Sequence, residues 1–213
     1  MAAAAGIRLN WQDMSDISDA VPLLARVYPN GMADVNHFNA AGGLGFLIRE
    51  LLSEGMLHED ARTIWGDSLN DYAVEAKLKS DGTIERVPAP LNSGDEKVLA
   101  PIGKAFQQTG GIKLLKGNLG NAIIKTSAVK PERHIIEAPA MVFEDQNSLI
   151  TAFKAGQLEK DFVAVIRFQG PKANGMPELH KLLPSLGVLQ DKGFKVALVT
   201  DGRMSGEIGR AHV

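Results

Sequence analysis

Apolar residues recur with a helical period in the first part of the chain. Between Leu44 and Leu52 they return every three to four positions, which predicts an amphipathic helix that Gly55 would end. A shorter apolar stretch over residues 23–27, with Pro22 in its first turn, predicts another helix. The residues suited to capping this helix are Asp16, Ser18 and Asp19. We therefore expect residues 1–72 to be mainly helical.

From Ile112 onward the pattern changes to short apolar runs of the kind found in strands. The predicted strands cover residues 122–126, 135–136, 140–143, 162–168 and 195–200. One helix is predicted among them, over residues 146–155, and Gly156 is suited to its C-terminal end. With the helical first part, these strands predict an α/β fold.

The last two predicted strands enclose a loop and a short helix, for which Pro177 is suited to the first position. This order predicts a β–loop–α–β unit. If its strands are parallel and its crossover is right-handed, the loops after both strands emerge at the same edge of the sheet. We then expect Glu178, which would lie in the first turn of the short helix, to come near Ser205 in the second loop.

Turn-forming residues concentrate between the helical part and the strand-rich part. Ser80-Asp81-Gly82 and Pro88-Ala89-Pro90 are typical of turns and linkers. We expect a boundary over residues 79–111, between one domain over residues 1–78 and a β-rich domain over residues 112–206.

Composition narrows the classes of function. The chain has 213 residues, of which 45% are hydrophobic and 23% charged, and its formal net charge is −2. This balance argues against nucleic acid or an anionic membrane as a partner. The longest apolar stretches fall short of the roughly 18 residues of a membrane-spanning helix, so a cytoplasmic protein is expected. The chain has no cysteine, which excludes disulfides and thiolate-held metal sites within it.

A carboxylate, a guanidinium and a hydroxyl follow the last predicted strand. They belong to Asp201, Arg203 and Ser205, and Gly202 and Gly206 let the backbone bend around them. Ligands of open α/β sheets usually bind at such strand ends, although the spacing is equally typical of an ordinary polar turn. Ser205 is not in a G-x-S-x-G nucleophile elbow. For Glu178 the spacing leaves two roles open, namely helix capping and metal coordination.

Two further features could bind an anion. Residues 116–120, Lys-Gly-Asn-Leu-Gly, resemble a phosphate-cradling turn but do not follow the P-loop pattern. Lys125 lies near this turn with Lys130 and Arg133, in a cluster that is either a solvated face or a contact for an anionic substrate. The five histidines are scattered and form no H-x-x-x-H pair.

Several motifs together resemble those of the dihydroxy-acid and 6-phosphogluconate dehydratase family. They are, in chain order, Asp34-Val35-Asn36-His37-Phe38-Asn39-Ala40-Ala41-Gly42-Gly43, Gly117-Asn118-Leu119, Ile124-Lys125-Thr126-Ser127-Ala128-Val129, Gly170-Pro171-Lys172-Ala173-Asn174-Gly175-Met176-Pro177-Glu178 and Val199-Thr200-Asp201-Gly202-Arg203-Met204-Ser205-Gly206. The resemblance covers residues 1–206. Residues 129–134 and 177–182 are similar to the phosphogluconate branch in particular.

The resemblance implies a hydro-lyase of the Entner–Doudoroff pathway that converts 6-phospho-D-gluconate to 2-dehydro-3-deoxy-6-phosphogluconate. It assigns removal of the C2 proton to Ser205, supported by Arg203, and coordination of Mg²⁺ or a similar divalent cation to Glu178. A 4Fe-4S cluster acts on the departing hydroxyl in the family. The remaining expected contacts of the sugar-acid phosphate are Asp201, Lys116, Asn118 and Lys125. The resemblance also implies a homodimeric parent, in which residues 1–78 end an α/β N-terminal domain and residues 112–206 belong to a swivelling domain.

The chain also departs from the family pattern. The cluster cysteines of the family lie upstream of the matching region, so we expect a fragment that is incomplete at both ends, with Met1 inside the parent protein, and that is inactive alone. Residues 207–213 differ from the family and match the translation of a sequencing adapter, GAG-ATC-GGA-AGA-GCA-CAC-GTC, so we expect them to carry no functional information. The alternatives are a dehydratase acting on a dihydroxy acid or another sugar acid, and a non-catalytic swivelling module that binds an anion.

Overall fold

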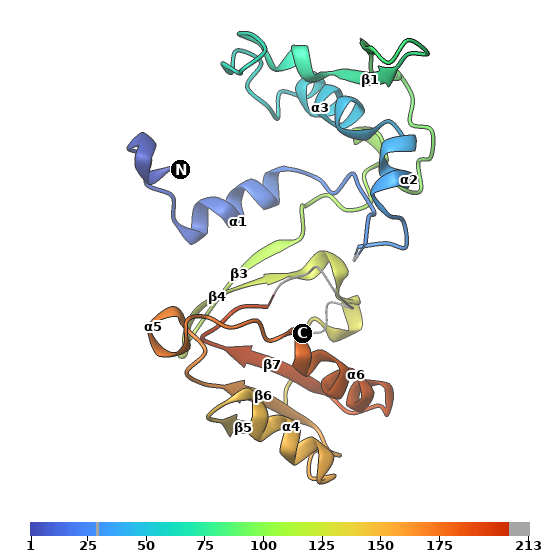
Figure 1. Cartoon of the computed structure of the whole chain (residues 1–213). Coiled ribbons are helices and arrows are strands. Elements are labelled where there is room, and N and C mark those ends of the chain that lie inside the picture. The colour runs from blue at the N-terminus through green and yellow to red at the C-terminus, as the bar shows by residue number, and fades with distance from the viewer. Residues whose placement is uncertain (29, 205–213) are drawn as a thin grey trace. The chain divides into compact units, whose positions relative to one another are not determined.

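The computed structural model describes residues 1–28 and 30–204 and divides the chain into two compact units, Met1–Ile123 and Ile124–Val213. Helices and strands are mixed along the chain, which confirms the predicted α/β class (Figure 1). The compact division falls after the segment 79–111 that the sequence marks as a boundary.

Over its described residues, the first unit contains three α-helices and two β-hairpins, the second of which ends just beyond the division. The helices are α1 (Trp11–Ala20), α2 (Val35–Ala40) and α3 (Gly43–Ser53). The strands are β1 (Val74–Leu78) with β2 (Ile84–Pro88), which are antiparallel, and β3 (Ile112–Gly117) with β4 (Gly120–Lys125). Short 3₁₀ turns cover Ala3–Ala5, Leu69–Tyr72 and Ile102–Lys104.

The helix predicted between Leu44 and Leu52 is confirmed as α3, whereas the helix predicted over residues 23–27 is wrong. The backbone there is extended and forms bridges with Leu99 and Gln107, because those partners satisfy its N–H and C=O groups without a helix. The helix lies earlier, as α1, and its cap is Asn10 instead of Asp16, Ser18 or Asp19. The Asn10 side chain accepts hydrogen bonds from the backbone of Gln12 and Asp13.

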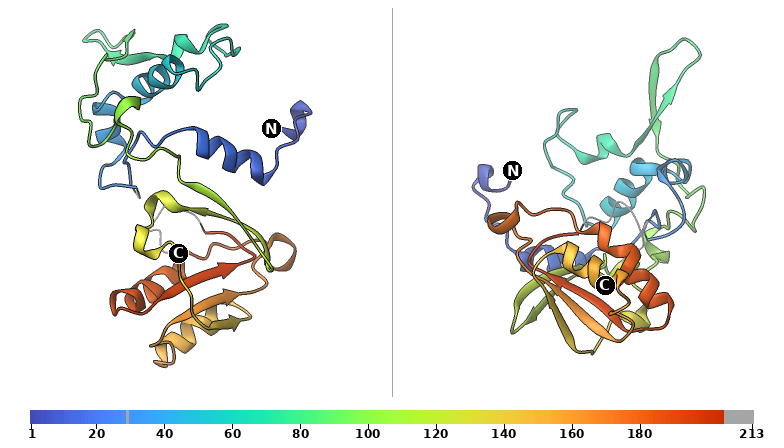
Figure 2. Two further views of the ribbon diagram at one scale, coloured as in Figure 1. Left: turned by 180° about the vertical axis from the view of Figure 1, so that it is seen from behind. Right: turned by 60° about the horizontal axis from the view of Figure 1, so that its bottom comes forward.

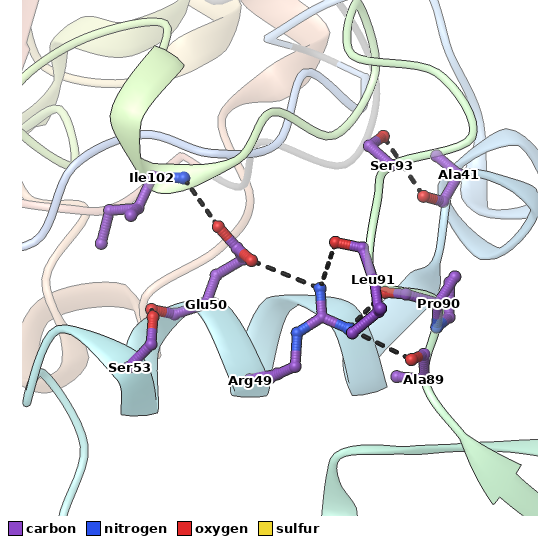
Figure 3. Close-up of polar contacts among 9 residues, drawn as sticks. All are labelled: Ala41, Arg49, Glu50, Ser53, Ala89, Pro90, Leu91, Ser93 and Ile102. Carbon is purple, nitrogen blue, oxygen red and sulfur yellow. Dashed lines mark hydrogen bonds and ion pairs between the residues drawn. The ribbon is translucent and has the colours of Figure 1, made fainter.

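A cluster of polar contacts holds the segment after β2 against α3 (Figure 3). The guanidinium of Arg49 donates to the backbone carbonyls of Ala89, Pro90 and Leu91, the last over 2.9 Å. The neighbouring carboxylate of Glu50 accepts the N–H of Ile102 at 3.0 Å. Polar groups of two consecutive helix residues therefore position residues 89–102, which the sequence marks only as a linker.

The second unit is built on a parallel sheet of three strands in the order β5–β6–β7 (Figures 1 and 2). The strands are β5 (Ala140–Phe143), β6 (Phe162–Ile166) and β7 (Val196–Thr200), and the helices are α4 (Gln146–Lys154), α5 (Pro171–Asn174) and α6 (Leu183–Asp191). Three 3₁₀ turns cover Thr126–Ala128, Pro131–Arg133 and His180–Leu182. In β6, Phe162, Ala164 and Ile166 are fully buried and pack with residues of α4 and α6 in one core.

Most elements predicted from residue 122 onward are confirmed, including the helix over residues 146–155 and the strands over 122–126, 140–143, 162–168 and 195–200, each within a few residues. Residues 135–136 form no strand. The helix predicted to begin at Pro177 is wrong in its start: α6 begins at Leu183, with Pro184 in its first turn. Among the residues that the structure describes, no helix is long and apolar enough to cross a membrane.

Candidate functional site

The loops that follow β6 and β7 lie at the same end of the sheet. The two strands are parallel neighbours, and Ile166 at the end of β6 pairs with Thr200 at the end of β7. This confirms the parallel β–loop–α–β unit predicted from the sequence. Polar residues that are far apart in the sequence are thereby brought to one edge, where open α/β sheets commonly bind ligands.

Glu178 and Arg203 meet at this edge. Their backbones form an isolated parallel bridge, and Nη1 of Arg203 donates to Oε2 of Glu178 at 3.3 Å. Glu178 is therefore not in the first turn of a helix, as the sequence predicts, but in an extended segment before the 3₁₀ turn His180–Leu182. The bridge to the second loop competes with helix formation at this position.

The Glu178 carboxylate has further contacts within its own loop. Its Oε1 accepts the N–H of Leu179 at 3.1 Å and lies 3.9 Å from Nδ1 of His180. About a quarter of the Glu178 side chain is exposed, at 24%, whereas Leu179 is completely buried in the core of the unit. Leu179 thus anchors the backbone beside a side chain that is partly exposed to solvent.

Asp201 forms a second contact between the loops that follow β6 and β7. Its Oδ1 accepts the N–H of Gln169 at 2.8 Å. The next residue, Gly202, lies so close that a Cβ on it would stand 2.8 Å from Cβ of Gln169 and 3.2 Å from Cδ1 of Leu179. Only a glycine fits this approach without displacing the neighbouring loop. The Asp-Gly pair of the motif therefore has a structural role in fixing the edge.

Gln169 is a site residue that the sequence analysis missed. Its amide is buried, donates to the carbonyls of Arg167 and Phe168 at 3.0 and 3.1 Å, and accepts from Nε2 of Gln146 at 3.1 Å. A single glutamine after a predicted strand carries no signal of this role. The signal available is indirect, since a buried amide at a strand end needs partners.

The backbone around the first loop has an unusual conformation. Phe168 and Met176 are the non-glycine residues with positive φ in the described part of the chain, at 59° and 53°. Such conformations cost free energy and are frequent at functional sites. Between them, Gly170 begins the short helix α5 and Gly175 ends it in the left-handed region. The Gly-x-x-x-x-Gly-Met-Pro-Glu segment thus forms a tight turn that places Glu178 at the edge of the sheet.

The other predicted site residues are not gathered at this edge by any contact described here. Ser205 lies outside the described residues, as do residues 206–213. Lys116 and Asn118 belong to the first unit, where Nζ of Lys116 donates to Oε1 of Gln12 at 2.8 Å and Asn118 lies in the turn between β3 and β4. Lys125 ends β4 and is exposed. Their roles stay predictions.

The described residues do not by themselves complete a metal centre. Over residues 1–28 and 30–204, no three histidine, aspartate or glutamate side chains are grouped so that they could hold an ion. Glu178 contributes one carboxylate, and Arg203 already binds one of its oxygens. The chain also has no cysteine to bind an iron–sulfur cluster.

Family models match both parts of the chain. The model described as dihydroxy-acid/6-phosphogluconate dehydratase C-terminal matches residues 97–213, and the corresponding N-terminal model matches residues 1–72. The chain belongs to the dihydroxy-acid/6-phosphogluconate dehydratase family.

Among its relatives are proteins named phosphogluconate dehydratase. That of Rhizobium meliloti is 65% identical over 210 residues, which are 99% of this chain and 35% of the relative. That of Pseudomonas aeruginosa is 60% identical, over 99% of this chain and 34% of the relative. The dihydroxy-acid dehydratase of Caldanaerobacter subterraneus is 35% identical, over 97% of this chain and 35% of the relative. The chain spans about a third of the length of these relatives.

Proposed function

We propose that this chain is part of a hydro-lyase that dehydrates 6-phospho-D-gluconate to 2-dehydro-3-deoxy-6-phosphogluconate. The observation that carries the proposal is the contact between Glu178 of the Gly-Met-Pro-Glu motif and Arg203 of the Asp-Gly-Arg-Met-Ser-Gly motif. The choice of substrate is supported by identities of 65% and 60% to phosphogluconate dehydratases, against 35% to a dihydroxy-acid dehydratase.

The reaction removes water across C2 and C3 of the sugar acid. A base takes the proton from C2, the C3–O bond breaks, and the departing hydroxyl takes up a proton to leave as water. The resulting enol tautomerises to the 2-keto acid. Such a reaction needs a base near C2 and fixed positive charge near the oxygen on which negative charge develops.

In this proposal the base is the alkoxide of Ser205, which becomes the hydroxyl when it takes the C2 proton, and Arg203 supplies the positive charge that stabilises negatively charged oxygen there. A guanidinium remains protonated at any physiological pH, so its charge is constant. The contact with Glu178 orients Arg203, and the partly buried Met204, which precedes Ser205 in the sequence, packs against the core. Asp201, Lys116, Asn118 and Lys125 are proposed as contacts of the polar and phosphorylated ends of the substrate.

The proposed cofactors are a 4Fe-4S cluster and a divalent cation such as Mg²⁺, on the strength of family membership. The cluster ligands would have to come from polypeptide outside this chain, because it lacks cysteine. A cation on Glu178 would have to share the carboxylate with Arg203 and take its other ligands elsewhere. We also propose a homodimeric parent, and the mechanism above does not depend on it.

The test is a chimera in which residues 1–206 replace the matching region of the Rhizobium meliloti relative. We expect the chimera to form the 2-keto acid from 6-phosphogluconate after anaerobic reconstitution, and the isolated chain to form none. In the chimera Glu178→Gln should abolish turnover, while Glu144→Gln, an exposed carboxylate of the same unit, should retain it.

Turnover by the isolated chain would contradict the assignment as part of an enzyme. Turnover of a dihydroxy acid in place of the phosphorylated substrate would assign the chain to the other branch of the family. A folded, cofactor-loaded chimera that binds phosphogluconate without converting it would favour a binding module.

A further inference from the structure

The two compact units differ sharply in how their apolar residues are placed. In the second unit eleven buried residues form one core around the sheet. Among the described residues of the first and longer unit, the corresponding cluster of buried residues contains only Ala41, Phe46, Val98 and Leu99. Large apolar side chains of the first unit that remain exposed include Ile7, Leu9, Met32, Val35, Leu44, Ile64 and Leu91. A domain of this length ordinarily buries far more.

Helix α1 shows this most clearly, because its buried and exposed sides are the reverse of those expected. Trp11, Met14 and Ile17 recur at helical spacing and are 61%, 44% and 58% exposed. Its buried residues are instead Ser15 and Ser18. In a surface helix of a globular protein the apolar stripe normally faces the core.

Polar contacts hold α1 in this orientation. The hydroxyl of Ser18 accepts the N–H of Ile112 at 2.9 Å, and its carbonyl accepts the N–H of Gly110 at 2.6 Å. Lys113 forms an ion pair with Asp19. The polar side of α1 therefore contacts the segment that leads into β3 (Figure 1). The helix cannot rotate its apolar stripe toward the core without breaking these bonds.

We propose that the stripe formed by Trp11, Met14 and Ile17 is a docking surface for polypeptide that the relatives possess and this chain does not span. Two observations favour this occupant. The relatives extend over about three times the matched length, as the 35% coverage shows. Exposed apolar residues also occur throughout the first unit, as expected when a domain lacks part of its core. A second copy of the chain is the alternative occupant, but a dimer contact would cover one patch only. The proposal does not depend on the chemistry proposed above.

The test places a photo-crosslinking residue, p-benzoylphenylalanine, at position 14 of the chimera and locates the product by mass spectrometry. We expect a link within one polypeptide, to a peptide from the part of the Rhizobium meliloti relative outside the grafted region. Radical footprinting should also label the peptide containing Trp11 and Met14 severalfold less in the chimera than in the isolated chain.

A paired substitution provides the control. Met14→Asp should lower the urea midpoint of the chimera and leave that of the isolated chain unchanged, whereas Val188→Asp, on α6 with a similar exposure of 45%, should act equally in both. A link to a second copy of the chimera would overturn the proposal. Labelling as strong in the chimera as in the isolated chain would overturn it as well. Neither readout requires activity, so a failure of the proposed function would leave this test intact.

Discussion

Nη1 of Arg203 lies 3.3 Å from Oε2 of Glu178, although 25 positions separate the two residues in the chain. The contact follows from the parallel pairing of β6 and β7, which places the loops after both strands at one edge. It joins the two motifs that carry the proposed chemistry.

Arg203→Met should separate a catalytic role from a structural one. The side chain is 57% exposed, and such surface pairs contribute about 0–1 kcal/mol to stability. We expect a small loss of stability but a fall in kcat of the chimera by about 100-fold or more, because charge at the developing oxyanion is lost. Arg167→Met is the matched control, since Arg167 pairs with Glu144 at 3.7 Å on the same unit. Equal rates for the two variants in a steady-state assay would contradict the role of Arg203.

Gly202→Ala should disturb the edge without removing any functional group. The added methyl would lie 2.8 Å from Cβ of Gln169 and 3.0 Å from its carbonyl oxygen, so the loops must separate. Overpacking of this kind costs about 1–3 kcal/mol. Hydrogen exchange of the β7 amides in the isolated chain should become faster. Gly103→Ala, where nothing lies within 4 Å of the new methyl, should leave these amides unchanged; unchanged exchange in both variants would argue against the tight contact.

Arg49→Met should release the segment that follows β2. The substitution removes the donor for the carbonyls of Ala89, Pro90 and Leu91, of which Ala89 is buried and Leu91 is exposed. A buried acceptor left unsatisfied costs about 1–3 kcal/mol, so we expect most of the effect to come from Ala89. Amide exchange over residues 89–102 should increase. Arg62→Met provides the control, because Arg62 is 87% exposed and pairs only with Asp67 among the contacts described. If both variants exchange alike, the contacts in Figure 3 do not hold this segment.

The cap of α2 should make a contribution to stability that depends on pH. Hydrogen bonds from the backbone and side chain of His37 lower the pKa of Asp34 below its ordinary value of 3.8. Because the folded pKa is the lower one, the contribution is complete above pH 3.8 and is lost as the pH falls through the folded pKa. An NMR titration should place the Asp34 pKa below 3.8, and His37→Ala should raise it. A value unchanged by His37→Ala would contradict the part assigned to the imidazole, because the alanine variant keeps the backbone N–H of residue 37.

The elements that sequence patterns predict well are those whose packing follows local periodicity. Strand β6 is the clearest case, because Phe162, Ala164 and Ile166 alternate with less buried residues and are themselves buried in the core. Helix α3 also lies where the pattern predicts it and buries Phe46, although Leu44 of its apolar stripe is exposed. The hairpin β1–β2 was missed because it is mostly exposed, with charged residues such as Glu75 and Arg86 on it, and its turn residues resemble a linker.

Tertiary contacts explain the errors in the first unit and at the site. The stretch 23–27 has apolar residues at helical spacing, but hydrogen bonds to Val98 and Gln107 draw it into extended pairing. Pro177 is suited to the first position of a helix, but the bridge between Glu178 and Arg203 keeps this segment extended. The helix α6 therefore begins only at Leu183. Strand order predicts that Glu178 comes near the loop after β7, but the partner expected there is Ser205, whereas the contact in the structure is with Arg203. The buried contacts of Gln169 carry no signal in the sequence and are visible only in three dimensions.

Glu178, Gln169, Asp201 and Arg203 all belong to the second compact unit, and every contact among them is internal to it. The contacts described among these four residues therefore need no residue of the first unit. If the proposed function holds, carboxylate and guanidinium form a half-site whose two groups are already joined before a substrate arrives.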